Sequence, residues 1–429
     1  MKSTKIPVLV LTFLLLLTWV SVTSWHTRAD SPGAAVKPTE LKALVIDAAE
    51  YPSLQAAFDA VPRAGGLVRL PPGRFKLAEP LVLSRSDTRV IGAGAATCLI
   101  NGNQEGKPAL IVRPAGKGKL WRVQLADFRI CGDPEYVEAK STHPKSGDGL
   151  LAENINEIFI HGLSVDHNGG HGVNLVNCYE DPRICNSIFT YNRLSGVNIK
   201  GGHDIIVNAN QFEENQDALR CVDSFNLCFN GNNLDDHRGN GVVIENTYGS
   251  VLSGNMIEEC RGTAVILDRD CYGITISANV LADNFGGSVD LRDAWGCAVS
   301  ANTFTIAAVR ALVIGPGSGR ITVTGNNFSD SFIGEKTRRA GKPNLATGII
   351  LQGTSDITVS GNVFSGLEEQ AVKADEKCRR LAVTGNVVIG VNRKSAGEGP
   401  AIDVGGDAQT INQHNVITRA KLPPEKPTR

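Results

Sequence analysis

A short phrase recurs along the chain about every 23 residues: an apolar residue, two spacers, an asparagine, one spacer and another apolar residue. Its asparagines are Asn210, Asn232, Asn255, Asn279, Asn302, Asn326, Asn362, Asn386 and Asn415, and Leu163 and Ser187 hold the same place in two earlier copies. From residue 163 the successive intervals are 24, 23, 22, 23, 24, 23, 24, 36, 24 and 29 residues. A fixed period of this length predicts a repeat protein in which each unit stacks on its neighbours.

Each unit carries a second apolar segment about ten residues after the asparagine position, as in Gly241-Val242-Val243-Ile244 and Ala264-Val265-Ile266-Leu267. The alternation has a period of two, which is typical of short strands with one face inward, and helical spacing is absent. We therefore predict an all-β fold, a single-stranded right-handed parallel β-helix with three short strands per coil of about 23 residues. A leucine-rich-repeat horseshoe has a similar period, but its one strand per unit is rich in leucine.

A stacked coil exposes unpaired strand edges at its ends, so a cap is expected there. The apolar residues Leu54, Ala57, Phe58 and Val61 follow helical spacing, and Ser53 precedes them as an N-cap. The sequence predicts an N-terminal capping helix within a cap at residues 51–66.

The N-terminus has the layout of a secretory signal. Lys2 and Lys5 precede an apolar run from Ile6 to Val20, which is followed by small polar residues. We predict a signal peptide at 1–24, a linker at 25–43, the β-helix at 44–417 and a flexible tail at 418–429. The protein is then secreted or periplasmic. Retention of the segment as an anchor is the alternative, although fifteen residues are short for a membrane span, which needs about 20.

Charge and cysteine usage exclude several classes of protein. The formal net charge is −1, whereas a non-specific nucleic-acid binder needs a basic excess. The ten cysteines form no CxxC pair, so neither a zinc site nor a redox motif is indicated. Cys221 is expected to pack as a small apolar residue, and Cys271 and Cys297 lie on neighbouring turns where a disulfide could form.

The stretch from Tyr51 to Val61, followed by Gly65-Gly66-Leu67-Val68-Arg69-Leu70-Pro71-Pro72-Gly73, resembles the N-terminal cap and first coil of pectate-lyase-superfamily proteins. The resemblance covers roughly residues 44–417 and implies polysaccharide binding along a groove on one strand face. Catalytic signatures of the superfamily are not carried over. Gly170-His171-Gly172 and Asn215-Gln216-Asp217 resemble fragments of the polygalacturonase signatures, but here the Gly-His-Gly fragment comes first, whereas in polygalacturonases it follows. We therefore assign both fragments to turns.

Alignment of the second apolar segments sorts the side chains that face outward. If Val265 and Leu267 face inward, Asp268 faces outward, and charge gathers on five adjacent coils between Lys200 and Asp293. Glu245 and Asp268 become stacked neighbours, which share a proton, bind a cation such as Ca²⁺, or are neutralised by bases. Neutralisation by Arg269 and Arg292 in a surface ladder is the alternative to a functional site.

We predict two sets of site residues on this face. The catalytic candidates are Glu245, Asp268, Asp290 and Arg292, with Glu245 and Asp268 as ligands of a tentative calcium ion. The substrate-binding candidates are Lys200, Arg220, Asp223, His171, His203, Arg269 and Asp293.

The predicted function is an exported polysaccharide-active protein, a lyase or glycoside hydrolase of acidic glycan such as a uronate-containing polymer. The alternative is a non-catalytic β-helix scaffold that binds carbohydrate or protein. A monomer without a stable membrane span is expected, and calcium is the one cofactor considered.

Overall fold

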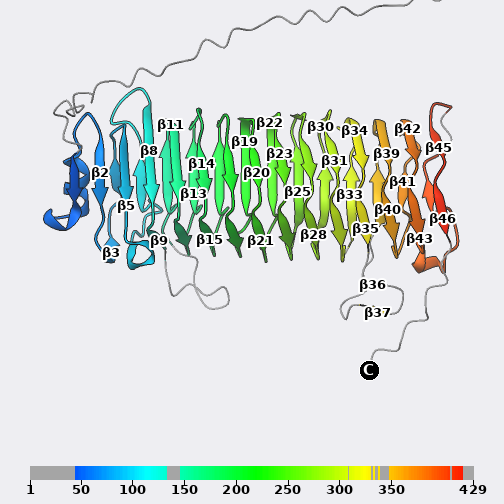
Figure 1. Cartoon of the computed structure of the whole chain (residues 1–429), viewed down its shortest axis with the longest axis horizontal. Coiled ribbons are helices and arrows are strands. Elements are labelled where there is room, and N and C mark those ends of the chain that lie inside the picture. The colour runs from blue at the N-terminus through cyan, green and yellow to red at the C-terminus, as the bar shows by residue number, and fades with distance from the viewer. Residues whose placement is uncertain are drawn as a thin grey trace, which may run out of the picture. The chain divides into compact units, whose positions relative to one another are not determined.

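The computed structural model describes residues 44–132, 145–307, 309–329, 332–333, 337–338, 347–405 and 408–418. The predicted signal peptide at 1–24, the linker at 25–43 and the tail beyond residue 418 lie outside these residues. Within them, the chain winds as a right-handed parallel β-helix, as predicted. Its coils lie side by side along one axis, from the N-terminal helix to the last strands (Figure 1).

Each regular coil contributes one strand to each of three parallel ladders, which confirms the expected three strands per coil. The first ladder contains β4 (Leu81–Leu83), β7 (Leu110–Val112), β10 (Leu150–Glu153), β13 (Val173–Val176), β16 (Val197–Lys200), β19 (Leu219–Phe225), β22 (Val242–Tyr248), β25 (Thr263–Asp268), β29 (Gly287–Leu291), β33 (Arg310–Ile314), β38 (Thr347–Leu351), β41 (Val372–Ala374) and β44 (Ile402–Asp403). These strands follow the Gly or Ala positions of the repeat.

The second ladder contains β1 (Val45–Asp47), β2 (Gly66–Arg69), β5 (Thr88–Ile91), β8 (Leu120–Ala126), β11 (Ile155–His161), β14 (Arg183–Cys185), β17 (Ile206–Asn208), β20 (Cys228–Asn230), β23 (Val251–Ser253), β27 (Thr275–Ser277), β31 (Ala298–Ser300), β34 (Gly319–Thr324), β39 (Ser355–Ser360), β42 (Arg379–Thr384) and β45 (Ile411–Gln413). Two short strands, β26 (Cys271–Tyr272) and β30 (Ala294–Trp295), lie at the corner between the first and second ladders.

The third ladder is a separate sheet that follows the repeated asparagine. It contains β3 (Gly73–Leu77), β6 (Thr97–Asn101), β9 (Arg129–Cys131), β12 (Ser164–Asp166), β15 (Ile188–Thr190), β18 (Gln211–Glu213), β21 (Asn233–Asp235), β24 (Met256–Glu258), β28 (Val280–Ala282), β32 (Thr303–Thr305), β35 (Asn327–Ser329), β40 (Val363–Ser365), β43 (Val387–Ile389) and β46 (Val416–Thr418). A two-stranded antiparallel pair, β36 (Phe332–Ile333) and β37 (Thr337–Arg338), stands apart from the ladders.

The predicted capping helix is α1 (Leu54–Asp59). The Ser53 hydroxyl accepts a hydrogen bond from the backbone N–H of Ala56 at 3.1 Å, and Leu54, Ala57 and Phe58 are buried. Three short 3₁₀ helices, η1 (Ala48–Glu50), η2 (Gly94–Ala96) and η3 (Arg393–Ser395), complete the described helical structure.

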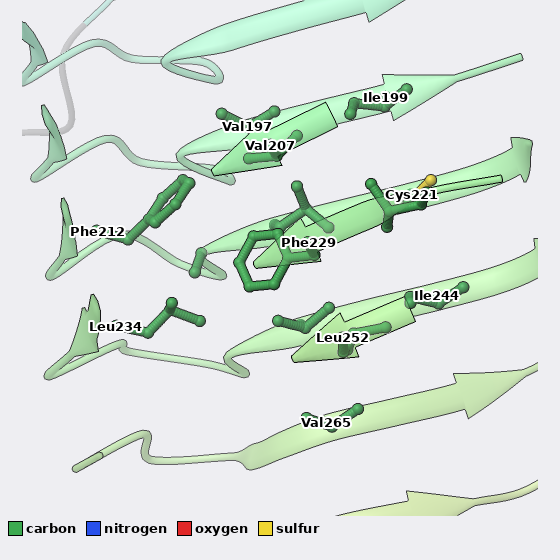
Figure 2. Packing of buried hydrophobic residues seen from close by; sticks show 14 of the residues in the cluster. Val197, Ile199, Val207, Phe212, Cys221, Phe229, Leu234, Ile244, Leu252 and Val265 are labelled. Atoms are coloured by element: carbon green, nitrogen blue, oxygen red, sulfur yellow. The ribbon is translucent and has the colours of Figure 1, made fainter. Parts of the chain in front are cut away.

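Alternate residues of all three ladders point into one apolar core. Figure 2 shows Val197, Ile199, Phe212 and Phe229 on this inner side, together with Cys221, which packs as an apolar residue as predicted. Burial of each such side chain stabilises the fold by roughly 1.5–3 kcal/mol, so the aliphatic repeat sets the cross-section of every coil. All ten cysteines are free, so the suggested Cys271–Cys297 disulfide is wrong, and both thiols are buried.

The repeated asparagines form a buried hydrogen-bonded ladder between the second and third strands of successive coils. The Oδ1 atom of Asn232, for example, accepts hydrogen bonds from both the backbone N–H and the Nδ2 atom of Asn210, each at 3.0 Å. The same pattern continues from coil to coil as far as Asn415. Because buried amides are costly unless they are paired, this arrangement explains why the repeat retains asparagine.

A second buried polar ladder occupies the turn between the third and first ladders. Asn168 donates to Asn192 at 2.9 Å and Asn192 donates to Asn215 at 2.8 Å. The next coil has His237 at this place, and its Nδ1 atom accepts the backbone N–H of Asn215 at 3.2 Å. His237 is fully buried, and its Nε2 atom has no hydrogen-bond partner among the described residues.

Candidate functional site

A cleft of about 510 Å³ opens on the outer face of the first ladder. It is lined by His171, Leu194, Ser195, Asn198, Lys200, Gln216, Asp217, Arg220, Val222, Asp223 and Arg269. Five of the substrate-binding candidates from the sequence, namely His171, Lys200, Arg220, Asp223 and Arg269, are therefore brought together here. We call this surface the cleft.

The cleft is bordered by a row of polar residues that precede the strands of the first ladder by two positions. The backbone N–H of His171 donates to Asp148 Oδ1 at 2.7 Å, and the backbone N–H of Ser195 donates to His171 Nδ1 at 3.2 Å. Further along, the backbone N–H of Asn240 donates to Asp217 Oδ1 at 2.7 Å. The side chains of Asp148, His171, Asp217 and Asn240 thus each accept a hydrogen bond from the turn of the next coil, which fixes their positions.

Asp217 is the carboxyl group most deeply set in the cleft. Its Oδ1 atom accepts hydrogen bonds from the backbone N–H of Asn240 at 2.7 Å and from the Nδ2 atom of the same residue at 3.2 Å. Burial raises the pKa of Asp217, and the bonds from Asn240 and the charges of Arg220 and His171 only partly offset that effect. A general acid requires a carboxyl group that is held in position and has a raised pKa, and Asp217 has both properties.

His171 lines the same cleft two coils away from Asp217 and is half-buried. Burial lowers the pKa of His171, and the nearby carboxylate of Asp148 opposes this shift only in part. Because its Nδ1 atom accepts a backbone N–H, the neutral ring carries its proton on Nε2. His171 is therefore suited to donate a hydrogen bond to a ligand rather than to remove a proton from it.

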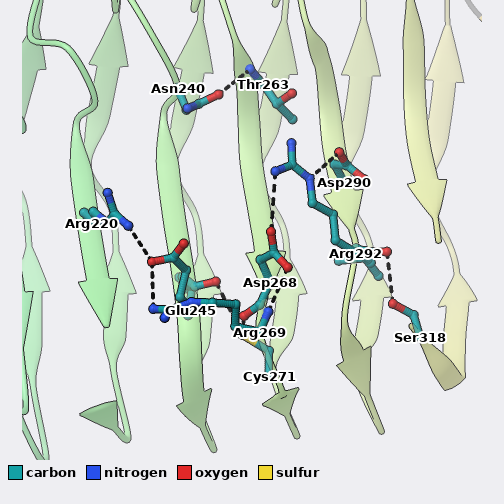
Figure 3. A network of polar contacts seen from close by, with 12 residues as sticks. Arg220, Asn240, Glu245, Thr263, Asp268, Arg269, Cys271, Asp290, Arg292 and Ser318 are labelled. Carbon is teal, nitrogen blue, oxygen red and sulfur yellow. Dashed lines mark hydrogen bonds and ion pairs between the residues drawn. The ribbon is translucent and has the colours of Figure 1, made fainter. Parts of the chain in front are cut away.

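The cations of the cleft differ in their partners. Arg220 and Arg269 both contact Glu245 Oε2, at 2.6 and 3.0 Å, and only 14% of the Glu245 side chain is exposed (Figure 3). Lys200 is exposed and has no carboxylate partner among the described residues. Lys200 and the two arginines thus offer hydrogen-bond donors to an anionic ligand, while Asp217 and Asp223 add carboxyl groups to the same cleft.

The catalytic candidates from the sequence do not line the cleft. Glu245 and Asp268 are neighbours in register, as expected, and Arg292 contacts Asp268 at 3.5 Å and Asp290 at 2.9 Å (Figure 3). This network has the form of the ion-paired ladder that the sequence offered as an alternative. The catalytic role of these four residues stays a prediction.

Two further candidates lie outside the cleft. Asp293 accepts the backbone N–H of Asp270 at 2.8 Å, and His203 lies near the corner between the first and second ladders, 2.9 Å from Asp204. Their predicted role in substrate binding is not tested by this arrangement.

Three groups of described residues bring possible metal ligands within reach of one another: Cys131, Asp166 and His167; Glu180, His203 and Asp204; and Asp235, Asp236 and Glu259. The first group alone combines a thiol with an imidazole, two ligand types that suit copper. There, however, Arg129 binds Asp166 through two hydrogen bonds of 2.6 and 2.7 Å, and burial raises the pKa of the Cys131 thiol to about 12. A guanidinium group and a protonated thiol do not fit a copper site.

Positively charged side chains also contact the two predicted calcium ligands. The carboxylates of Glu245 and Asp268 are contacted by Arg220, Arg269 and Arg292, as Figure 3 shows. Calcium at this place stays a prediction, and the guanidinium groups weigh against it.

Comparisons with known proteins agree with the fold. A family model described as periplasmic copper-binding protein (NosD) matches residues 183–345, which is less than half of the chain. No curated protein sequence matches. Among the described residues, no helix has the length and apolar character needed to cross a membrane.

Solved structures resemble the chain at low sequence identity, and these likenesses define the fold alone. The pre-mature gene product 12 of bacteriophage phi29 has a TM-score of 0.66 and 13% identity, with 85% of this chain and 53% of that chain covered. The Agl-KA catalytic domain has a TM-score of 0.58 and 15% identity, with 77% and 65% covered. DFA-IIIase from Arthrobacter chlorophenolicus A6, in complex with GF2, has a TM-score of 0.52 and 13% identity, with 73% and 94% covered. The chain thus spans less than two thirds of the first two of these proteins.

The sequence interpretation missed Asp217, which it assigned to a turn. Asp217 precedes the inward residue Leu219 by two positions, and His171 precedes Val173 by the same number. Alignment of this position across the repeats would have placed the two side chains in one row. The outward-facing positions compared in the sequence lie within the strands, after the first inward residue of each one. The row precedes the strands and was therefore missed.

Proposed function

We propose that the protein is an exported β-helix protein that binds an acidic polysaccharide in the cleft and cleaves it, with Asp217 as the general acid. The observation that carries the proposal is the environment of Asp217, whose pKa is raised by burial and whose Oδ1 atom is held by Asn240. A carboxyl group with a raised pKa holds its proton to a higher pH than an ordinary aspartate, and in the protonated form it can protonate the oxygen of a glycosidic bond.

The cations of the cleft support an acidic substrate. Lys200 is exposed without a carboxylate partner among the described residues, and Arg220 shares its partner Glu245 with Arg269. Guanidinium and ammonium groups bind the carboxylate of a uronate through charge-assisted hydrogen bonds. A uronate carboxylate thus supplies a partner for Lys200.

Hydrolysis agrees better with the side chains than a lyase reaction does. A glycoside hydrolase uses a second carboxylate as nucleophile or base, and Asp223 lines the same cleft as Asp217. A lyase needs a base that removes a carbon-bound proton, and the neutral ring of His171 presents a proton rather than a lone pair. The fold likeness to known structures supports the scaffold and says nothing of the reaction. Export rests on the predicted signal at 1–24.

The test uses purified protein with polygalacturonate, alginate and hyaluronan, each with added calcium or with a chelator. Both reactions produce new reducing ends, and only a lyase also produces unsaturated ends that absorb ultraviolet light. Asp217→Asn should lower turnover by at least about 100-fold because it removes the acid while it keeps the shape. Asp283→Asn, a matched change in the turn that follows β28, should leave turnover unchanged.

Two results would contradict the proposal. Production of neither kind of end from any polymer refutes cleavage and favours a glycan-binding scaffold. Full activity of the Asp217→Asn variant removes Asp217 from the mechanism. Unsaturated ends would instead assign the reaction to the lyase class.

A further inference from the structure

A row of aromatic side chains lies at the corner between the first and second ladders. It contains Tyr179, His203, Phe225, Tyr248, Tyr272 and Trp295, one from each of six successive coils. Phe225 pairs in register with Tyr248, Tyr248 with Tyr272, and Tyr272 with Trp295. We call this row the aromatic corner. Successive rings are therefore one coil apart, a spacing of about 4.8 Å.

The rings of the first four coils pack against one another. Tyr179 and His203 are stacked with centroids 4.9 Å apart, and Phe225 and Tyr248 are stacked at 5.5 Å. At the near end, the ammonium group of Lys119 lies 5.2 Å above the Tyr179 ring. These four rings therefore partly cover one another's faces, and the stacking holds them in place.

The rings of the last two coils lie over glycines of the next coil. A methyl group added at Gly296 would come within 3.2 Å of the Tyr272 ring, and one added at Gly319 within 2.7 Å of the Trp295 ring. Tyr272 is 52% exposed and stacks on no other ring among the described residues. One side of the Tyr272 ring therefore rests on the backbone and the other side is open to a ligand.

Three of the six rings are exposed and the other three are half-buried, and an apolar surface of this kind points to an interaction site. Tyr179 and Phe225 are 39% and 38% exposed, and polar side chains flank the row on both sides. Asp204 accepts a hydrogen bond from Asn226 at 2.9 Å, and the Tyr248 hydroxyl donates to Asp270 at 2.9 Å. These carboxylates lie along the middle of the row, whereas Lys119 lies over Tyr179 at one end and Arg320 lies 5.8 Å from the Trp295 ring at the other, so the charges along the row are mixed and do not favour a polyanion.

We propose that the aromatic corner is a second binding site, and that its ligand is a linear neutral polysaccharide. The carbon-bound hydrogens of a sugar ring pack on an exposed aromatic face, and the hydroxyl groups bond to the flanking Asn and Asp side chains. A row one ring wide matches a linear chain, whereas a globular partner needs a broad patch of about 800 Å². This site is independent of the cleft and of the activity proposed for it.

The test measures binding of hydroxyethyl cellulose, xyloglucan and dextran by affinity electrophoresis and by the fluorescence of Trp295. The wild-type protein should be retarded by at least one of them. Tyr272→Ala and Trp295→Ala should each weaken binding by about fivefold, and the double variant should weaken it further. Phe285→Ala, which removes an exposed aromatic ring away from the corner, is the matched control and should bind like the wild type.

The Asp217→Asn variant separates this proposal from the proposed function, because it should bind neutral glycan normally while cleavage of acidic glycan is lost. Failure of all three neutral polymers to bind would overturn the second site even if the cleft proves active. Equal binding by the Tyr272→Ala, Trp295→Ala double variant would do so too. Binding of phosphatidylcholine–phosphatidylglycerol vesicles through Tyr272, without glycan binding, would reassign the aromatic corner to a membrane.

Discussion

His237 should make the fold sensitive to acid. Burial lowers the pKa of His237 to about 3, with the charge of Arg238 acting in the same direction, whereas a histidine in an unfolded chain has a pKa of about 6.5. Between these two values the unfolded chain binds a proton that the folded chain does not bind. The free energy of unfolding therefore falls as the pH falls through this window. Relative to pH 8, the loss is about 2 kcal/mol at pH 5 and about 3 kcal/mol at pH 4.

The substitution His237→Asn tests this calculation. Asparagine holds the equivalent place in two preceding coils, as Asn192 and Asn215, so the variant keeps an acceptor for the backbone of Asn215 without a titrating ring. Urea unfolding at pH 8 and pH 5 should show that the wild type loses about 2 kcal/mol more than the variant.

The control is His414→Asn, a change at an exposed histidine, which should lose stability in parallel with the wild type. An unchanged difference in stability between the wild type and His237→Asn at the two pH values would refute the reasoning. The buried His237 ring would then be charged, or have a partner, in the folded state.

Three further perturbations test the core, the asparagine ladder and the thiols. Ile314→Asp puts an unpaired charge into the fully buried inner face and should abolish the folded circular dichroism spectrum, whereas Ile411→Asp at an exposed position should not. Asn302→Ala removes the acceptor of two hydrogen bonds from Asn279 and should cost about 3 kcal/mol in urea unfolding; a loss below about 1 kcal/mol would contradict the ladder's role. Thiol titration in denaturant should count ten free cysteines, and fewer would indicate a disulfide such as Cys271–Cys297.

The fold was predictable because its determinants are local and repeated. An Asn such as Asn302 must be paired when buried, so it recurs wherever a tight turn stacks on its equivalent, and the period of the repeat can be read directly. The register followed from the same alignment, since Glu245 and Asp268 are neighbours as expected. The suggested Cys271–Cys297 disulfide failed because adjacent positions in a stack do not ensure that two thiols point toward each other.

The candidate site was less predictable. An alignment of the repeats gives the face on which a residue lies, but it does not give the side-chain conformations that decide which charged groups bind each other. The sequence placed Arg220 and Glu245 on one face but could not tell that they bind each other at 2.6 Å. The aromatic corner, by contrast, was readable. Its residues recur at intervals of 24, 22, 23, 24 and 23, but they lie among turn residues whose number varies between coils, outside the columns that were aligned.

Glu245 now distinguishes the two interpretations of the charged face. If Glu245 is catalytic, as the sequence suggested, Glu245→Gln should abolish turnover and leave substrate binding largely intact. If it serves to hold Arg220 and Arg269, the same change releases two guanidinium groups beside the cleft. Turnover then persists, the KM for acidic glycan falls, and the gain disappears at high salt because the released charges are exposed and screened. Steady-state kinetics at two ionic strengths, with Asp217→Asn measured alongside, therefore identify either Asp217 or Glu245 as the general acid.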